Sequence, residues 1–259
     1  MSNYNQLTKD LIQWIKDYFD KPENRHCKAI IGISGGVDST VAAALCVKAL
    51  GKDRVLGVLL PQKAITDGTD NDVVSTLGIH FCRIDISGLY DELSTRINYA
   101  IDGLEDFLNL SQGGIQDVYA YSTNTPARLR MMIFYGLAAI NGDRVVNTCN
   151  LSERYVGYMT KFGDAAGDFS PLHNLTKTEI IGIGEALGLP DYLVHKAPSD
   201  DMCGQTDEEK FGFSYADLDT YLREGEIDAD IFNKIEAMHS KSLHKELAMP
   251  AFMPRKENY

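Results

Sequence analysis

The sequence lacks any cysteine pattern that would build a disulfide framework or a zinc site. Its five cysteines are scattered, odd in number and never spaced as C-x-x-C. Isolated cysteines of this kind are typical of reduced thiols in an intracellular protein. We therefore expect a fold that is held together by its hydrophobic interior.

Long apolar runs and positive charge are also scarce. No run approaches the ~20 apolar residues that a membrane-spanning helix requires, and the first residues, MSNYNQLTKDLIQW, carry charge too early for a signal peptide. The 25 lysines and arginines are outnumbered by 37 acidic residues, so the formal net charge is −12. Nucleic-acid and anionic-membrane surfaces need a basic stripe. We therefore predict a cytoplasmic protein with no nucleic-acid partner and no membrane partner.

Hydrophobic patterning predicts an α/β fold with a parallel sheet flanked by helices on both sides and a helical C-terminal extension. A continuous apolar strand is expected at 29–33 and a second buried strand at 54–61, with further strands at 80–86 and 143–150. Helices are expected at 7–18, 40–50, 69–78, 89–100, 125–142, 176–188, 215–225 and 229–244. Pro126 suits the first turn of its helix, and the weak periodicity of 108–124 predicts a mobile or partner-covered connection. Residues 1–259 are expected to form a single domain.

The stretch IIGISGGVDSTVAAAL places a glycine turn between an apolar strand and a helix. Its spacing fails the dinucleotide pattern G-x-G-x-x-G, and no lysine follows Gly36 as a Walker loop requires. What remains is S-G-G-x-D-S, in which two glycines let backbone N–H groups approach an anion while Ser34 and Ser39 add hydroxyl donors. Asp38 would repel a phosphate unless a cation lay between them. The turn therefore predicts Mg²⁺ bound by Asp38 together with substrate phosphates.

Two segments carry a family resemblance. SGGVDST resembles the loop of the ATP pyrophosphatases, which cleave ATP between its α- and β-phosphates to adenylate a substrate. The segment NTCNLSERYVGYMTKFGDAAGDFSPLHNLTKTEI is similar to the NAD synthetase block, with a glutamate soon after the fourth strand, T-K-[FY]-G-D and P-L-x-x-L-x-K. With NTPARLRM and a C-terminal HK pair, the resemblance to the NAD synthetase family spans nearly the whole chain.

The resemblance implies an adenine nucleotide α-hydrolase-like fold and an ammonia-dependent ligase. Such an enzyme converts deamido-NAD, ATP and ammonia to NAD, AMP and pyrophosphate through an adenylated intermediate, which is the last step of NAD biosynthesis. ATP is its co-substrate and Mg²⁺ its metal. The resemblance also implies a homodimer and the absence of a glutaminase domain.

The resemblance assigns site residues one by one. Asp38 and Glu153 are predicted to hold Mg²⁺, and Lys177 to stabilise the charge that develops on the leaving pyrophosphate, so these three are the predicted catalytic residues. The predicted ATP contacts are Gly32, Ile33, Ser34, Gly35, Gly36, Val37, Asp38, Ser39, Thr148, Lys177 and Ser199. The predicted deamido-NAD contacts are Arg128, Lys161, Asp168, His244 and Lys245, with Asp164 and Arg130 as further candidates.

Two departures and two alternatives remain. Cys149-Asn150 stands where many relatives have Asp-His, and the 198–209 loop is shorter than in some members. One alternative is another ligase of the loop superfamily or a tRNA thiolase, although thiolases usually need paired cysteines and a basic surface. The other is a non-catalytic nucleotide-binding module, which would not need Glu153, Lys161 and Lys177 together. Formation of AMP from ATP, deamido-NAD, ammonium and Mg²⁺ separates catalysis from binding.

Overall fold

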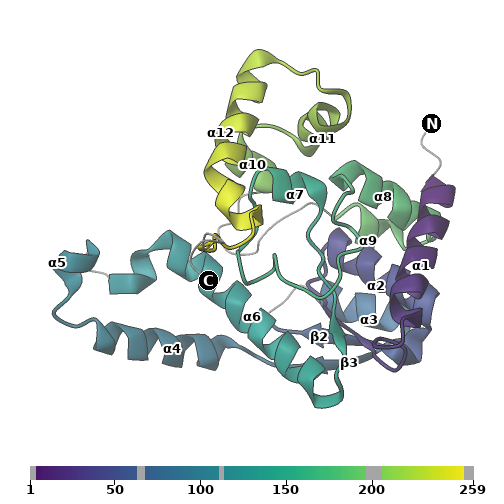
Figure 1. Cartoon of the computed structure of the whole chain (residues 1–259), viewed down its shortest axis with the longest axis horizontal. Coiled ribbons are helices and arrows are strands. Elements are labelled where there is room, and N and C mark those ends of the chain that lie inside the picture. The colour runs from purple at the N-terminus through teal and green to yellow at the C-terminus, as the bar shows by residue number, and fades with distance from the viewer. Residues whose placement is uncertain (1–3, 63–67, 111–113, 197–205, 254–259) are drawn as a thin grey trace.

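The computed structural model describes residues 4–62, 68–110, 114–196 and 206–253, and shows a parallel sheet with helices against both faces (Figure 1). In chain order the elements are α1 Tyr4–Asp20, β1 Ala29–Gly32, α2 Val37–Leu50, η1 Lys52–Arg54, β2 Val55–Leu59, α3 Thr69–Leu77, β3 His80–Arg83, α4 Ser87–Ala100, α5 Glu105–Leu108, η2 Gly114–Asp117, α6 Tyr119–Asn141, β4 Arg144–Val145, α7 Leu151–Tyr155, α8 Lys177–Ala186, α9 Asp191–Val194, α10 Asp207–Phe211, α11 Tyr215–Glu224 and α12 Ala229–Glu246.

Within the described residues, the sheet has four strands in the order β3-β2-β1-β4, and all neighbouring strands are parallel. Ile30 of β1 is in register with Leu56 of β2 on one side and with Val145 of β4 on the other. The carboxyl ends of β1 and β4 therefore meet at one edge of the sheet, where open α/β sheets bind their ligands.

The two faces of the sheet are buried in different cores. Ile31 belongs to the core formed with α1, α2 and α8, whereas its neighbour Ile30 belongs to the core under α6. Successive side chains of a strand point to opposite faces. A strand covered on both sides is therefore apolar throughout, as the sequence of β1 is, and the predicted fold class is confirmed.

The largest error of the sequence analysis concerns the start of α6. This helix begins at Tyr119, so part of the predicted 108–124 connection is helical and Pro126 lies inside the helix instead of in its first turn. The hydroxyls of Ser122 and Thr123 donate to the carbonyl oxygen of Tyr119 at 3.0 and 2.9 Å. Because the segment before Pro126 presents no apolar stripe, its periodicity did not reveal a helix.

The fourth strand is shorter than predicted. β4 ends at Val145, after which Val146 bridges to Phe169 and the Asn147 amide donates to the Phe169 carbonyl at 2.9 Å. The chain thus leaves the sheet early and pairs with the loop that precedes α8. The short helix α7 follows this turn, and the sequence analysis did not assign it.

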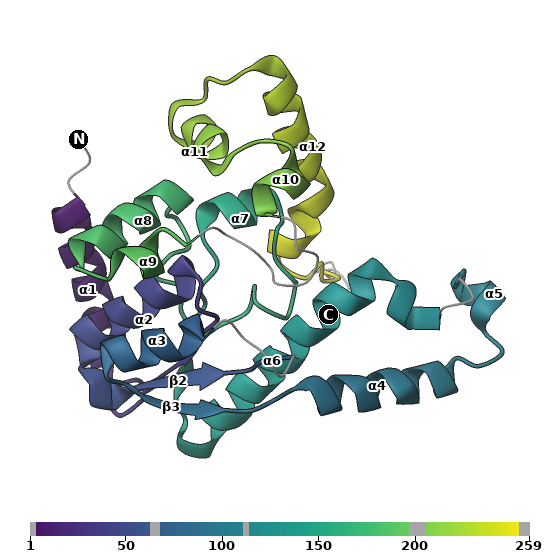
Figure 2. The same cartoon turned by 180° about the vertical axis from the view of Figure 1, so that it is seen from behind.

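The predicted helical C-terminal extension is confirmed. Helices α10, α11 and α12 lie beyond α7, away from the sheet (Figure 1, Figure 2), and share an apolar cluster that includes Phe211, Leu218 and Ile235. On the other side, α4 and α5 extend away from the sheet as an arm beside the start of α6 (Figure 2). In the described part of the chain, no helix combines the length and the apolar character needed to cross a bilayer.

Candidate active site

The glycine turn between β1 and α2 is shaped by its own serines. The Ser39 hydroxyl donates to the Gly36 carbonyl at 3.1 Å, and the Ser34 hydroxyl accepts from the Gly36 amide at 3.2 Å. Gly35 has φ +81, and a Cβ there would lie 3.0 Å from the Cβ of Thr69. The turn therefore requires glycine at Gly35 for its backbone conformation and for its close approach to α3.

Three predicted catalytic side chains meet beside this turn. Asp38 lies in the first turn of α2, Glu153 on α7, and Lys177 is the first residue of α8. The Lys177 ammonium forms an ion pair with Asp38 Oδ2 and a second one, of 3.3 Å, with Glu153 Oε1. Lys177 is only 5% exposed. The fold thus brings together three charges from three separate segments.

Helix caps aim two of these side chains. Asn150 caps α7: its side-chain oxygen accepts from the Glu153 amide at 2.8 Å, and its side-chain nitrogen donates to Asp38 Oδ1 at 2.9 Å. Thr176 caps α8 in the same way and accepts from the Glu179 amide, which fixes Lys177 as the first helical residue. The sequence analysis noted Asn150 only as a departure from relatives, although the spacing N-x-x-E is a capping-box signature.

Burial sets the charges of this cluster. Burial and the neighbouring Asp38 raise the pKa of Glu153 to about 8, although Lys177 opposes the rise. Burial lowers the pKa of Lys177, but Asp38 and Glu153 outweigh it and the pKa is raised overall, so the ammonium stays charged. Near neutral pH the metal-free cluster therefore holds an extra proton on Glu153. A further cation would displace that proton.

The donor set fits Mg²⁺. The carboxylates of Asp38 and Glu153 come from different helices, and each side chain is 16% exposed. Both contact the Lys177 ammonium, so the two carboxylates converge on one positive charge. Mg²⁺ is bound in proteins by one or two carboxylates with substrate phosphates and water. No cluster of three or more His, Cys, Asp or Glu side chains suited to a metal occurs among the described residues. Phosphate or water oxygens would have to complete the coordination.

The other predicted ATP contacts differ in their burial and in their surroundings. Ile33 and Val37 are buried within the turn, and Thr148 is half-buried beyond the carboxyl end of β4, next to the caps described above. Gly32 lies under Phe134, whose Cζ would be 2.5 Å from a Cβ at that position. Ser199 falls outside the described residues.

The predicted dinucleotide contacts gather around the end of α12. Lys161 donates to the His244 carbonyl at 2.5 Å, and Arg128 Nε donates to the Lys161 carbonyl at 3.2 Å. Lys245 donates to the carbonyls of Gly157 and Met159 at 2.7 and 2.8 Å. The side chains of Lys161 and Lys245 thus bond to backbone carbonyls and link α12 to the loop after α7.

Asp168 lines a cavity of ≈ 390 Å³ together with Lys245. One carboxylate oxygen of Asp168 accepts from the Val145 amide at 2.7 Å, and the other accepts from the Tyr135 hydroxyl at 3.4 Å. The cavity opens beside the carboxyl end of β4, where a ligand is expected. Its lining combines charged side chains such as Arg154 and Lys245 with the apolar side chains of Met159 and Phe169.

The two further candidates have structural contacts. Arg130 Nε donates to the Leu60 carbonyl at 3.0 Å and joins α6 to the end of β2, and burial lowers its pKa. Asp164 accepts from the Thr160 amide at 3.0 Å, and burial raises the pKa of Asp164. Both side chains therefore bond to the protein backbone, which is a structural role in this state.

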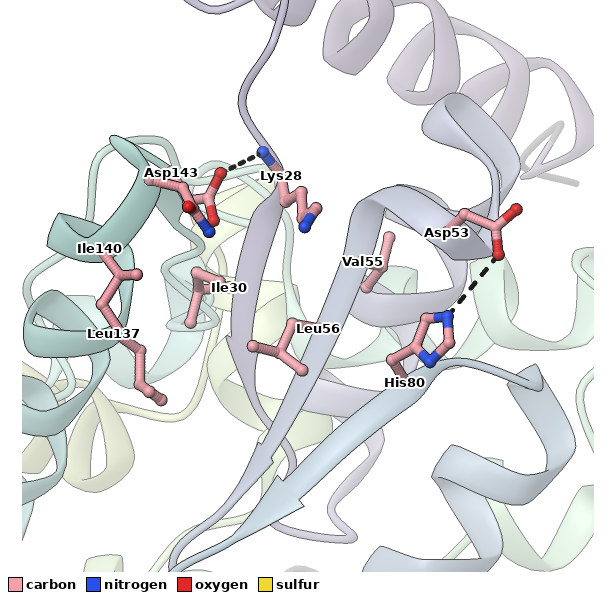
Figure 3. A pocket seen from close by; sticks show the side chains of 10 residues that line it. Lys28, Ile30, Asp53, Val55, Leu56, His80, Leu137, Ile140 and Asp143 are labelled. Carbon is pink, nitrogen blue, oxygen red and sulfur yellow. Dashed lines mark hydrogen bonds and ion pairs between the residues drawn. The ribbon is translucent and has the colours of Figure 1, made fainter.

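A second cavity, of ≈ 180 Å³, lies at the opposite edge of the sheet, by the amino ends of β1, β2 and β3 (Figure 3). Its lining includes Ile30, Leu56 and Ile140, and at its rim the His80 ring lies 3.8 Å from the Asp53 carboxylate. The carboxylate–lysine cluster is at the other end of the strands. We therefore place the candidate active site at the carboxyl ends.

Known proteins resemble the chain over most of its length. The family model described as NAD synthase matches residues 7–250. The NH₃-dependent NAD⁺ synthetase of Finegoldia magna is 36% identical, over 99% of this chain and 100% of the relative. The namesake enzyme of Pyrococcus furiosus is 37% identical, over 85% of this chain and 78% of the relative. A solved NMN synthetase from Francisella tularensis matches with a TM-score of 0.80 and 30% identity, over 98% of this chain and 99% of that one.

Proposed function

The chain belongs to the NAD synthase family, and on this premise we propose that it is an ammonia-dependent NAD⁺ synthetase, a ligase that amidates deamido-NAD with ATP. The observation that carries the proposal is the convergence of Asp38, Glu153 and Lys177 beside the twin-glycine turn. Family membership favours this reaction over the other loop-containing ligases and over a non-catalytic module.

The reaction has two steps. The nicotinic-acid carboxylate attacks the α-phosphorus of ATP, so that a carboxylate–phosphate bond forms and pyrophosphate leaves. Ammonia then attacks the activated carbonyl carbon, the new C–N bond forms and AMP leaves. Neither step needs a covalent bond to the protein, so catalysis consists of positioning and charge stabilisation.

Lys177 and the glycine turn act on the first step. The buried ammonium lies where it can stabilise the negative charge that moves onto the pyrophosphate. The backbone N–H groups of the turn and the positive end of α2 add to this field. We propose the remaining predicted ATP contacts, including Thr148 and Ser199, as ligands of the nucleotide.

Asp38 and Glu153 are the proposed Mg²⁺ ligands. When bound, the ion supplies positive charge that lets the triphosphate lie next to these two carboxylates. Asp38 and Glu153 orient the nucleotide through that charge, and Asn150 holds Asp38 in place. Glu153, whose pKa is raised in this cluster, would have to be deprotonated to hold the ion.

The deamido-NAD contacts form the second half of the proposed site. Arg128, Lys161, His244 and Lys245 lie at the end of α12, and Asp168 and Lys245 both line the cavity. The charged side chains suit a substrate that carries a carboxylate and two phosphates. We propose that Lys161 and Lys245 exchange their backbone partners for the substrate.

We also propose that the protein is a homodimer. Tyr99, Phe107, Tyr119 and Met132 on α4, α5 and α6 are at least 61% exposed, and several exposed apolar side chains on neighbouring helices favour an interface between two copies. Light scattering at micromolar concentration is expected to give the mass of two chains and, for Met132→Asp, the mass of one. A wild-type monomer would contradict the proposal. We also propose the cytoplasmic location that the sequence analysis predicts.

A second substrate is favoured by one observation. The solved structure with a TM-score of 0.80 is named an NMN synthetase, which forms a mononucleotide. The same amidation carried out on deamido-NMN would give NMN.

One assay tests both substrates. Purified protein is incubated with ATP, Mg²⁺ and ammonium, with either deamido-NAD or deamido-NMN, and AMP and the amide product are quantified. A higher kcat/KM for deamido-NAD is expected. A higher kcat/KM for deamido-NMN would mean that deamido-NMN is the substrate. Absence of AMP formation with both compounds would refute the ligase proposal. Glutamine in place of ammonium is expected to give little product.

A further inference from the structure

The C-terminal helices reach the catalytic cluster through one aromatic ring. Tyr215 is the first residue of α11 and is 5% exposed, and the Lys177 ammonium lies over its ring, 5.2 Å from the centroid. A cation within ~6 Å of an aromatic face is attracted to it, most strongly where both groups are out of water. Lys177 and Tyr215 meet that condition.

The ring itself is fixed. The Tyr215 hydroxyl donates to Asp207 Oδ2 at 3.2 Å, and the Tyr215 amide donates to Glu208 Oε1 at 2.8 Å. Asp207 is buried and also accepts, on its other oxygen, from the Tyr158 hydroxyl at 2.9 Å. Burial, together with Glu153 and Asp207, raises the pKa of Tyr215, so the phenol stays neutral.

The backbone that carries Lys177 is held by the same helix. Asp219, one turn along α11, accepts from the Thr178 amide at 2.7 Å and from the Ser152 hydroxyl at 2.5 Å. The Ser152 hydroxyl in turn accepts from the Lys177 amide at 3.0 Å. Helix α11 therefore contacts both the amino end of α8 and the helix that bears Glu153.

We propose that Tyr215 is a positioning residue for Lys177, a role that rests on the proposed function of that lysine in catalysis. In the metal-free protein, the carboxylates of Asp38 and Glu153 also hold the ammonium. The attraction of these carboxylates for the ammonium weakens when another cation binds them, whereas the attraction of the ring does not change. Tyr215 therefore keeps the ammonium in place when ATP and metal occupy the cluster.

Three variants separate the ring from the hydroxyl. Tyr215→Leu removes the aromatic face, Tyr215→Phe keeps it, and Tyr158→Phe removes the other tyrosine bond to Asp207 as a matched control. Tyr215→Leu is expected to lower kcat roughly tenfold with KM for ATP changed by less than about threefold, while both Phe variants stay within about threefold of wild type. A wild-type kcat for Tyr215→Leu, or an equal loss in Tyr215→Phe, would overturn the proposal.

A second measurement does not depend on turnover. The buried ammonium of Lys177 should give a slowly exchanging NH₃⁺ signal in heteronuclear NMR, assigned by its absence in Lys177→Met and displaced upfield by the ring. The displacement should persist in Tyr215→Phe and vanish in Tyr215→Leu. Its persistence in Tyr215→Leu would overturn the proposal.

Two further outcomes are distinguishable. If Tyr215→Leu fails to fold, Tyr215→Met fills the same space without a ring and takes its place in both measurements. If the NMR result is as expected but the wild type makes no AMP, the ligase function fails while the contact that positions Lys177 stands.

Discussion

Asn150 donates its side-chain amide to Asp38 Oδ1 at 2.9 Å, across the gap between the first turns of α7 and α2. The same side chain accepts from the Glu153 amide at 2.8 Å. One fully buried amide thus sets the position of both proposed metal ligands relative to each other. Its removal would affect the stability of α7 and the geometry of the cluster together.

Asn150→Ala is therefore expected to lower kcat by at least about tenfold and the free energy of unfolding by about 1–2 kcal/mol. Asp228, which caps α12 by accepting from the Asp230 amide at 2.9 Å, provides the control. Asp228→Ala should lose a comparable cap energy, measured by urea denaturation, and keep its kcat. A wild-type kcat for Asn150→Ala would show that the amide only caps the helix.

Asp38→Ala is expected to lower turnover by at least ~10², the scale for losing one transition-state stabiliser. The variant leaves the buried Lys177 with Glu153 as its remaining carboxylate partner in the cluster. Asp53→Ala, which removes an exposed carboxylate at the amino end of the sheet, is the matched control and should keep its turnover. Turnover is followed as AMP formation, and near-normal rates for Asp38→Ala would refute the metal assignment.

The chemistry of the glycine turn nominates Asp38, and the family resemblance nominates Glu153 and Lys177. The structure brings the three side chains together, and their catalytic roles stay proposals. Their convergence follows from the parallel sheet, which gathers the carboxyl ends of β1 and β4 at one edge. The Asn150 cap was also readable, since Asn150 and Glu153 have capping-box spacing.

Tyr215 and Asp219 could not be found in this way. Periodicity identifies α11 as an amphipathic helix but does not say which element its buried face meets. The contacts to Lys177 and Ser152 arise only when α11 packs on α7 and α8. Periodicity also fails to reveal the start of α6, because the residues from Tyr119 to Pro126 are too few to show a helical period by themselves.

The raised pKa of Glu153, about 8, predicts how the stability of the metal-free protein depends on pH. In the unfolded chain a glutamate titrates near ~4.3, so between these values the native state binds one more proton than the unfolded state. The free energy of unfolding should therefore fall as pH rises through this window, by up to about 1.4 kcal/mol per pH unit from this group.

Glu153→Gln, which resembles the protonated side chain, isolates that contribution. Urea denaturation with a chelator present, at several values between about pH 5 and 8, gives the free energy of unfolding of each protein. The quantity of interest is the difference obtained by subtracting the value for the variant from the value for the wild type. The difference should decline with rising pH. The raised pKa of Lys177 keeps that group charged throughout, so it does not obscure the slope. A flat or rising difference would contradict the assigned protonation.

Gly157 and Ser242 test the attachment of α12. Gly157 has φ +69, and a Cβ there would lie 2.0 Å from the Ser242 Cβ, so Gly157→Ala must displace α12. Gly225 has φ +79 with nothing within 4 Å, so Gly225→Ala carries the backbone cost of about 1–2 kcal/mol without the clash. Gly157→Ala should lose about 1–3 kcal/mol more in urea denaturation.

The same pair separates substrate binding from stability. Displacement of α12 moves Lys245 away from the Gly157 carbonyl, where it now donates at 2.7 Å, and carries His244 with it. We expect KM for deamido-NAD to rise roughly tenfold in Gly157→Ala, the equivalent of one hydrogen bond to a charged group. KM for ATP should change little, and Gly225→Ala should leave both constants unchanged. An equal rise in KM for ATP would mean that α12 supports the whole site and does not bind the dinucleotide.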